Sequence, residues 1–524
     1  MAETGKPAPA TDPGSDDMNA LVKGGRTNTL GFVIRLLGGI PFLFIGYRLY
    51  GVEEMGRFAS AVVVVELFAL ICALGEKRGL AQRLTLGSKV DGQKRVNLVF
   101  DGMLASLIIS SIVVLLLAFF PYPIFPNGMS GRYDILIIGA IPAFALTEIL
   151  LAAQAYRFDI ATTVRARAVV EPWTRSFAVV AFFFIPTLRD GGVALAYLVS
   201  IYAALAAAAW PFFRTYGPPR AWRPRPRYLI QMIGKALPLA GADVIERGTR
   251  LIDVFILGLS ASPTAVGIYY FAKEVASLPQ KLKTSFEPVL SPVITKNLKT
   301  GDFSAIAKQV RQVGFWIVAL QLGIALSLAI PGEAVMGLGG PAIVGGTGAL
   351  ALLLVAEAVA SMAVVSEGVL VYIAKKRNLA ISTGVIALQI AMTVGLIMLV
   401  ERLGLDDGFK AAGAATALLI ALGISSVVKA LLLKKLLGAP VGNLRMALVW
   451  ATGAAVIVGQ IAILLPEWLE LAIGIPAILA AYGWVIWTKG FGPEDRVLFR
   501  KSKKVAESDG KARAQENAAE PPGS

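Results

Sequence analysis

Histidine is absent from the 524-residue sequence, and cysteine occurs once, as Cys72 within an apolar run. The chain therefore lacks the usual zinc ligand and the usual proton shuttle, and it cannot form an internal disulfide or a cysteine metal site. The glycine-rich run GLGGPAIVGG at 337–346 lacks the lysine and the spacing of a nucleotide-binding phosphate loop. We expect no metal, no bound cofactor and no ATP hydrolysis, and any proton relay must use Asp or Glu.

Charged residues are also scarce, at 16%, whereas 56% of the residues are hydrophobic. Uncharged apolar runs of about 18 or more residues recur, and each predicts a transmembrane helix. The runs are continuous rather than alternating, which excludes a transmembrane barrel. Residues 1–28 lack the basic-then-apolar pattern of a cleaved signal peptide. The sequence therefore predicts an all-α polytopic membrane protein. Its transmembrane helices number about fourteen, at about 29–50, 58–80, 97–120, 134–156, 169–187, 193–213, 234–259, 266–292, 308–331, 347–373, 379–402, 410–434, 445–465 and 467–488.

The loops between these helices alternate in charge. One set is nearly free of Lys and Arg, with Arg57, Arg132 and Arg189 as its exceptions. Basic loops face the cytoplasm, so both termini are expected there. The net charge of +15 is then mostly a topology signal, and nucleic acid is not an expected partner. The basic set consists of Lys89, Lys94, Arg95, Arg165, Arg167, Arg220, Arg223, Arg225, Arg227, Lys296, Lys299, Lys375, Lys376, Arg377, Lys434 and Lys435.

A short motif occurs twice, as LYGVEEMGRFASA at 49–61 and as SASPTAVGIYYFAKE at 260–274. Each copy is a turn, then Gly, one intervening residue, and then aromatic residues and Ala. Aligning Gly56 with Gly267 maps the first predicted helix onto the seventh and the third onto the ninth. Parallel repeats of this kind in a transporter imply two six-helix lobes facing a central cavity, here followed by an extra helix pair. The predicted domains are a disordered tail at 1–28, an N-lobe at 29–213, a basic linker at 214–233, a C-lobe at 234–434, the helix pair at 435–488 and a second tail at 489–524.

The seventh apolar run, PLAGADVIERGTRLIDVFILGL at 238–259, carries five charged residues. At mid-membrane each charge costs about 2.5–3.5 kcal/mol, so five facing lipid would cost on the order of 12–17 kcal/mol. On one straight helix all five fall within an arc of about 120°. We therefore expect this face to line the central cavity. The alternative is a ladder of local pairs, acid first and four residues apart, that only orients the helix. The five charges are Asp243, Glu246, Arg247, Arg250 and Asp253.

The repeated motif, together with LIDVFILGL before its second copy and SFEPVLSPVI at 285–294 after it, resembles those of lipid-linked oligosaccharide flippases. These polysaccharide transporters belong to the multidrug/oligosaccharidyl-lipid/polysaccharide exporter superfamily. The resemblance covers about residues 25–490. It implies alternating access and a substrate of isoprenoid diphosphate carrying sugars, moved from the cytoplasmic to the periplasmic leaflet of the bacterial inner membrane for surface polysaccharide synthesis. The arginine-rich motifs expected of a lipid II flippase are absent, although fourteen helices would suit one.

A diphosphate crossing about 30 Å of hydrocarbon needs fixed cations, and Arg matches phosphate in bidentate fashion. Arg250 lies farthest from either membrane surface and is the leading candidate. For Arg35 the alternative to substrate binding is that its side chain extends to the lipid headgroups. For Arg175 the alternative is a local ion pair with Glu171. Lys281 and Lys283 follow the helix-bending Pro279 and can instead contact lipid phosphates. The candidate substrate-binding cations are Arg35, Arg175, Arg247, Arg250, Lys273, Lys281 and Lys283.

Acidic residues inside the predicted helices outnumber these cations. Some of them are candidates for coupling transport to H⁺ or Na⁺, with the membrane potential as a further driving force. Glu148 and Glu357 lead, because neither has a basic neighbour at helical spacing. The alternative to a coupling role is that each carboxylate forms a hydrogen bond or ion pair with another helix. The candidate cavity acids are Glu66, Asp101, Glu148, Asp243, Glu246, Asp253, Glu357 and Glu367.

Three other functions stay open. A drug/cation antiporter of the same superfamily suits the acidic interior. A membrane enzyme of polysaccharide assembly is disfavoured by the short outer loops. A scaffold for glycosyltransferases leaves the charged face unexplained. The expected partners are the lipid-linked oligosaccharide and membrane lipids, with a polysaccharide polymerase and glycosyltransferases as candidates.

Overall fold

A computed structural model describes residues 13–76, 79–80, 83–84, 92–157, 159–219, 222–281, 298 and 303–492, with side chains described except at 13–37, 92–94, 246 and 281. Within these ranges every regular element is a helix, as the continuous apolar runs predict. The N-lobe contains α1 (Pro13–Cys72), α3 (Gly92–Phe119), η1 (Asp134–Gly139), α4 (Ala140–Ala155), α5 (Ile160–Val164), η2 (Arg165–Val170), α6 (Glu171–Phe184), α7 (Pro186–Arg189) and α8 (Gly192–Tyr216).

The second half of the chain begins with α9 (Pro226–Gly248). The C-lobe then contains α10 (Ile252–Ser260), α11 (Pro263–Lys281), α13 (Phe303–Ala329), α14 (Gly332–Gly337), η4 (Pro341–Gly346), α15 (Thr347–Ser361), α16 (Val364–Ile373), α17 (Lys375–Arg402) and α18 (Asp407–Leu437). The extra pair consists of α19 (Met446–Ala462) and an antiparallel partner assembled from α20 (Glu467–Leu469), η5 (Glu470–Gly474), α21 (Ile475–Val485) and η6 (Ile486–Gly490).

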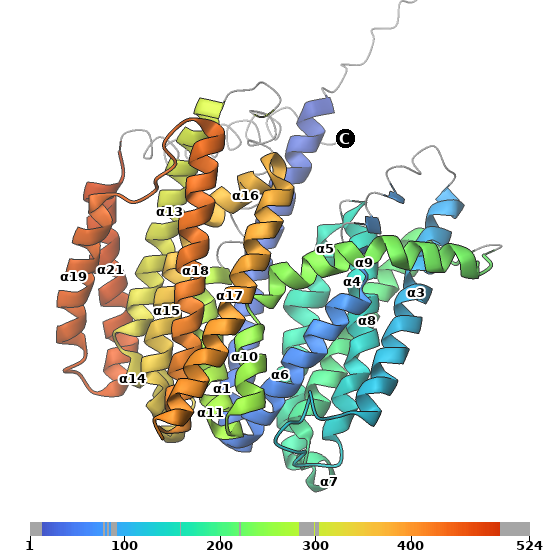
Figure 1. The fold of residues 1–524 in the computed structure, drawn as a ribbon, viewed down its shortest axis with the longest axis horizontal. Coiled ribbons are helices and arrows are strands. Elements are labelled where there is room, and N and C mark those ends of the chain that lie inside the picture. The colour runs from blue at the N-terminus through green and yellow to red at the C-terminus, as the bar shows by residue number, and fades with distance from the viewer. Residues whose placement is uncertain are drawn as a thin grey trace, which may run out of the picture.

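The two lobes stand side by side as an upright bundle (Figure 1). Helices α3, α4 and α8 lie to the right, α13, α19 and α21 to the left, and α10 and α11 between them. The lower end in Figure 1, where α7 and α14 lie, is the one that the loop charges predict to face away from the cytoplasm. We call it the outer end and the opposite one the inner end.

The first two predicted helices form a single element, α1, that reverses direction at Gly51. This residue has φ 85° and ψ 168°, outside the helical region and open to glycine at no steric cost. A Cβ on Gly46 would lie 2.8 Å from the Met55 sulfur. The two residues are nine apart, and in a straight helix that separation would hold them too far apart to touch. The predicted turn is therefore present, but it is a one-residue kink.

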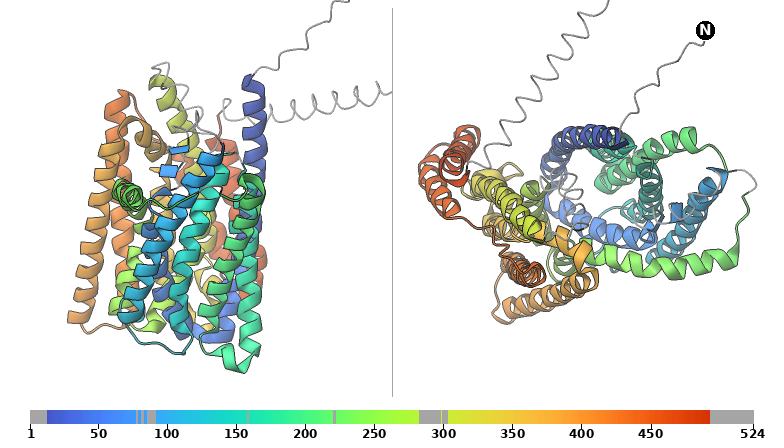
Figure 2. Two further views of the ribbon diagram at one scale, coloured as in Figure 1. Left: turned by 90° about the vertical axis from the view of Figure 1, so that its right-hand side faces the viewer. Right: turned by 90° about the horizontal axis from the view of Figure 1, so that it is seen from above.

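The predicted seventh helix, 234–259, is wrong as a single membrane-crossing element. It divides into α9 and α10, with a turn at 249–251. Helix α9 lies across the upright helices of the N-lobe (Figure 1) and is seen end-on in the left view of Figure 2. Its buried residues Leu229, Met232 and Ala236 recur at helical spacing and pack against Leu74 and Ala105.

The other predicted helices have counterparts among the described residues, with one more interruption at Met362 and Ala363 between α15 and α16; positions 282–292 of the predicted helix 266–292 lie outside the described residues. By length and composition, ten helical segments of the described chain can cross a membrane. Segment Gly38–Cys72 contains both the first and the second predicted helices. The fold is thus a polytopic helical bundle, and the count of fourteen crossing helices stays a prediction.

The apolar cores show where the two lobes join. One cluster combines residues of both lobes from the outer half of the bundle, such as Val62, Ile141, Val254, Tyr269 and Leu418. The inner halves have separate clusters, one within the N-lobe and one within the C-lobe. The lobes therefore share a core at the outer end and have their own cores at the inner end.

Candidate functional site

Arg250 lies in the turn that separates α9 from α10. The backbone N–H of Arg250 donates to the Arg247 carbonyl at 2.9 Å, and that of Leu251 to the Gly248 carbonyl at 2.9 Å. Gly248 is a poor helix former, which favours termination here. The five charges of this run consequently do not share one face of one helix, and that prediction is wrong. Two of them with described side chains, Asp243 and Arg247, stay on α9.

In the C-lobe, the Arg250 guanidinium forms an ion pair with the carboxylate of Glu357 on α15. The Arg250 side chain is 27% exposed and that of Glu357 is 8% exposed. The second oxygen of Glu357 is buried and accepts no hydrogen bond from the described residues. The leading candidate cation and one of the two leading candidate acids are therefore partners of each other, although they lie far apart in the sequence.

Asp253, at the start of α10, is completely buried. Its carboxylate forms an ion pair with Lys273 of α11 and accepts a hydrogen bond from the Tyr269 hydroxyl at 2.6 Å. The backbone N–H of Val254 donates to it at 2.9 Å. A buried charge is stable only when it is paired and hydrogen-bonded, and Asp253 meets both conditions. The predicted cation Lys273 and the predicted acid Asp253 are thus brought together.

The N-lobe has a corresponding chain of charges. Arg167 donates to Glu148 at 2.6 Å and to Glu171 at 2.7 Å, and Arg175 approaches Glu171 at 3.5 Å. The Arg167 guanidinium also lies 4.3 Å from the centre of the Phe144 ring. Glu148 therefore forms an ion pair with another element, which is the alternative to a role in ion coupling. The local pair between Arg175 and Glu171, the alternative for Arg175, is also present.

Arg167 was predicted to belong to a basic cytoplasmic loop, and this is wrong. The helix that holds it starts at Ile160 and passes through the π-helical turn η2, which places Arg167 inside the lobe with 14% of its side chain exposed. Such π-turns occur frequently at functional sites. A sequence signal for this was present: Arg167, Glu171 and Arg175 are spaced four apart, as partners on one helix face are.

Glu66 of α1 connects the two sets of charges. The charged side chains near enough to influence its carboxylate are Arg175 and Glu171 from the N-lobe and Glu274 and Arg247 from the second half of the chain. Glu66 is partly buried, as is Glu274. The charged interior of the protein therefore extends from one lobe to the other. We define this charged interior by Glu66, Glu148, Arg167, Glu171, Arg175, Arg250, Asp253, Lys273 and Glu357.

The remaining candidates lie elsewhere. Asp101 accepts a hydrogen bond from the indole N–H of Trp222 at 2.8 Å, so it fastens the linker to α3 rather than facing the charged interior. Glu367 pairs with Lys429 of α18 at 2.8 Å. On α9, Asp243 is partly buried and Arg247 is exposed. The side chains of Arg35, Glu246, Lys281 and Lys283 lie outside the described residues.

At the outer end the two lobes meet through the glycines of the repeated motif. A Cβ built on Gly56 would lie 1.7 Å from the Pro263 carbonyl oxygen, and one on Gly267 would lie 2.2 Å from that of Val52. The Tyr47 hydroxyl donates to the Gly267 carbonyl at 2.5 Å. Small residues allow helices in membranes to approach backbone to backbone. We call this contact the outer closure.

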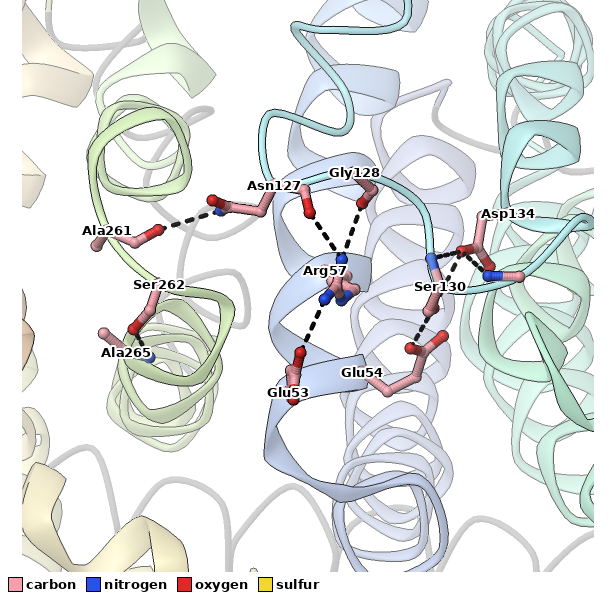
Figure 3. A network of polar contacts seen from close by, with 11 residues as sticks. Glu53, Glu54, Arg57, Asn127, Gly128, Ser130, Asp134, Ala261, Ser262 and Ala265 are labelled. Carbon is pink, nitrogen blue, oxygen red and sulfur yellow. Dashed lines mark hydrogen bonds and ion pairs between the residues drawn. The ribbon is translucent and has the colours of Figure 1, made fainter.

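A polar network surrounds the outer closure (Figure 3). Arg57 donates to the carbonyls of Asn127 and Gly128 at 2.8 and 3.0 Å and pairs with Glu53. The Asn127 amide in turn donates to the Ala261 carbonyl across the lobe boundary at 3.1 Å. Arg57, an exception among the poorly charged loops, therefore holds a loop that bridges the lobes.

The chain has the fold of several solved membrane transporters. The inward closed conformation of lipid II flippase MurJ matches with a TM-score of 0.64 and 13% identity, over 88% of this chain and 98% of that one. An inward-facing multidrug resistance MATE family transporter of the MOP superfamily matches with a TM-score of 0.56 and 14% identity, over 79% of this chain and 94% of that one. A mutant of the Vibrio cholerae MATE transporter VcmN matches with a TM-score of 0.53 and 12% identity, over 80% and 98%.

No curated protein matches the sequence significantly. The family model described as "Polysaccharide biosynthesis protein" matches residues 21–298, which is more than half of the chain. That stretch contains the N-lobe, the linker, both copies of the repeated motif and the Arg250 turn. By this match the chain belongs to the polysaccharide biosynthesis protein family, and it has the fold of the flippases and transporters of the MOP superfamily.

Proposed function

We propose that the protein is a flippase that moves an isoprenoid-diphosphate-linked oligosaccharide from the cytoplasmic to the periplasmic leaflet of the bacterial inner membrane by alternating access. The family supports polysaccharide synthesis as the setting, and the fold supports membrane transport. The observation that carries the proposal is the charged interior, which begins in the N-lobe and ends at Arg250 and Glu357 in the C-lobe. A polar headgroup crossing the membrane needs such a lining.

The paired state of Arg250 suggests how a diphosphate binds. Removing one partner of a buried ion pair costs about 3–5 kcal/mol, because the other charge is left uncompensated. A diphosphate oxygen pair can replace the Glu357 carboxylate on the guanidinium in bidentate geometry, so Arg250 stays neutralised throughout. Glu357 is then the group left without a partner. We propose that it takes up H⁺ or Na⁺ at this step, which would couple transport to an ion gradient.

The shared outer core and the separate inner cores support a direction for loading. With the lobes in contact at the outer closure and their apolar cores separate at the inner end, we propose that the charged interior is reached from the inner end. Substrate would bind there, the inner halves would close, and the outer closure would then open. The isoprenoid tail needs no polar path, because it remains in the hydrocarbon.

The proposal is tested on lipid extracts of cells with and without the gene. We expect loss of the gene to cause accumulation of isoprenoid-diphosphate oligosaccharide in the cytoplasmic leaflet and loss of surface polysaccharide. Arg250→Ala should fail to restore export, whereas the matched control Arg402→Ala, an exposed residue at the end of α17, should restore it. Normal levels of the lipid in both leaflets without the gene would refute the proposal.

A drug/cation antiporter is the second candidate function, because the carboxylates of the charged interior outnumber its cations. Acids released from their ion pairs bind organic cations. The same cells distinguish the two functions. Drug sensitivity without lipid accumulation would select the antiporter.

A further inference from the structure

A second polar site lies at the outer end of the N-lobe, apart from the charged interior. It is a half-open cavity of about 160 Å³. Tyr50 and Glu54 of α1 form one wall, Ser130 of the α3–η1 loop a second, and Arg189, Asp190 and Gly191 before α8 a third. This volume is of the size of one sugar ring, and because the cavity is half open the rest of a glycan can extend out of it.

The wall at Ser130 is held in place by hydrogen bonds. The buried Asp134 carboxylate accepts the backbone N–H groups of Ser130 and Gly131, each at 2.9 Å. The Ser130 hydroxyl donates to one oxygen of Glu54 at 2.5 Å (Figure 3). The cavity is therefore preorganised, which lowers the entropy cost of binding a ligand.

Two glycines allow the third wall to approach the other two. A Cβ on Gly191, which has φ +86°, would lie 2.8 Å from an Asp134 carboxylate oxygen. A Cβ on Gly192 would lie 2.3 Å from the Tyr50 hydroxyl oxygen. That hydroxyl donates to the Val179 carbonyl at 3.0 Å, so the Tyr50 ring is fixed as a side of the cavity.

The cavity also contains polar groups with unused hydrogen-bonding capacity. The exposed side chains of Arg189 and Asp190 form no hydrogen bond or ion pair with the described residues, although the Arg189 guanidinium lies 4.3 Å from the centre of the Phe183 ring. A donor fork, two carboxylates and an aromatic ring suit a molecule rich in hydroxyl groups. Because the two carboxylates exceed the single guanidinium, an anionic ligand is disfavoured and an amino group is favoured.

We propose that this cavity binds one neutral or amino-bearing sugar of the glycan on the outer side of the membrane. The inference rests on the proposed function for the source of that sugar, since a free saccharide would have the same chemistry. Glu54 precedes Gly56 of the outer closure by two residues. A sugar held here would keep the headgroup at the outer end after the closure opens, and so would oppose its return.

Saturation-transfer NMR on the detergent-purified full chain tests the site, with glucosamine, glucose and glucuronate as probes. We expect signal in that order of strength. Asp190→Asn should weaken glucosamine binding about tenfold, the size of one charge-assisted hydrogen bond. Arg189→Gln should weaken glucose binding and leave glucosamine the preferred probe. The matched controls are Arg132→Gln, an exposed residue of the neighbouring loop, and Asp406→Asn, at the outer end of the C-lobe.

The inference would be overturned if all three probes gave the same saturation, or if no probe gave any signal. It would also be overturned if the lining variants and the control variants bound the probes equally. The proposed function is judged separately, by the lipid measurement. Normal lipid distribution without the gene, together with sugar binding that Asp190→Asn weakens, would reject the flippase and keep the sugar site. Lipid accumulation without sugar binding would keep the flippase and reject the sugar site.

Discussion

Gly56 and Gly267, which occupy equivalent positions in the two copies of the repeated motif, pack against each other across the boundary between the lobes. A Cβ on Gly56 would lie 2.8 Å from the Gly267 backbone nitrogen, and one on Gly267 would lie 3.2 Å from that of Gly56. The internal repeat thus generates a nearly self-complementary contact. Each copy supplies the residue without a side chain that the other copy needs.

The outer closure should open when either glycine gains a side chain. In Gly56→Ala the Cβ would meet the Pro263 carbonyl oxygen, a backbone atom that cannot rotate away. We expect a cysteine introduced at Ser60 in a Cys72→Ala background to react roughly tenfold faster with a membrane-impermeant maleimide, a shift of about 1.4 kcal/mol in the opening equilibrium. Gly453→Ala, which has open space around it, is the control. An unchanged labelling rate in folded Gly56→Ala would contradict the assignment.

Removing Arg167 should destabilise the N-lobe far more than removing its neighbour Arg165. Arg167→Gln leaves Glu148 and Glu171 without their shared partner, a loss of about 3–5 kcal/mol in the free energy of unfolding. Arg165 is exposed, so Arg165→Gln should change it by less than about 0.5 kcal/mol. Thermal unfolding in detergent measures both. Adding Glu148→Gln to Arg167→Gln should restore part of the loss, and equal effects of the two arginine variants would show that Arg167 is not a buried partner.

Asp253 and Lys273 should be strongly coupled. Each single variant, Asp253→Asn or Lys273→Gln, leaves a buried charge unpaired, whereas the double variant leaves none. A double-mutant cycle on unfolding should therefore give a coupling free energy of about 1–3 kcal/mol. Tyr269→Phe should cost about 1–3 kcal/mol by itself, because Asp253 loses one hydrogen bond. Additive single variants would mean that the two charges do not interact.

The linker should become easier to cleave when its anchor is removed. Trp222 donates to Asp101 and lies against the Phe100 ring, with 5.7 Å between ring centres. Trp222→Phe removes a hydrogen bond to a charged group, worth about 1.5–3 kcal/mol. We expect trypsin to cut after the exposed Arg227, which Tyr228 follows, about tenfold faster or more; Arg223 and Arg225 precede prolines and resist trypsin. Trp210→Phe, an exposed residue of α8, should leave the rate unchanged. Equal cleavage of all three proteins would refute the anchoring role.

Much of the helical fold could be predicted from the sequence, because membrane-length apolar runs permit few other structures. The predicted break between 50 and 58 and the equivalence of Gly56 and Gly267 also follow from short local patterns. The division of 234–259 into α9 and α10 could not be predicted in this way. The apolar run continues through Gly248, and only packing against Leu74 and Ala105 shows that α9 lies across the N-lobe.

The site was predictable in its residue types and much less so in its pairing. The sequence predicts four of these residues as site residues because charge in a membrane helix is costly: Arg250, Asp253, Lys273 and Glu357. Their pairing depends on which segments become neighbours, and the Arg250 turn is separated from α15, which carries Glu357, by several helices. Arg167 was misplaced because the start of its helix was predicted too late in the sequence.

The outer closure is made largely of backbone atoms, and this determines how quickly it can separate. Contacts of this kind are held by dispersion and weak C–H···O interactions, each worth about 1 kcal/mol or less. Opening also requires the Tyr47 hydroxyl to leave the Gly267 carbonyl and the Asn127 amide to leave the Ala261 carbonyl. These are hydrogen bonds of neutral groups, which cost less to break than a buried ion pair, so we expect a low activation barrier. The slow step of a transport cycle would then lie in the exchange of partners at Arg250 rather than in the movement at Gly56 and Gly267.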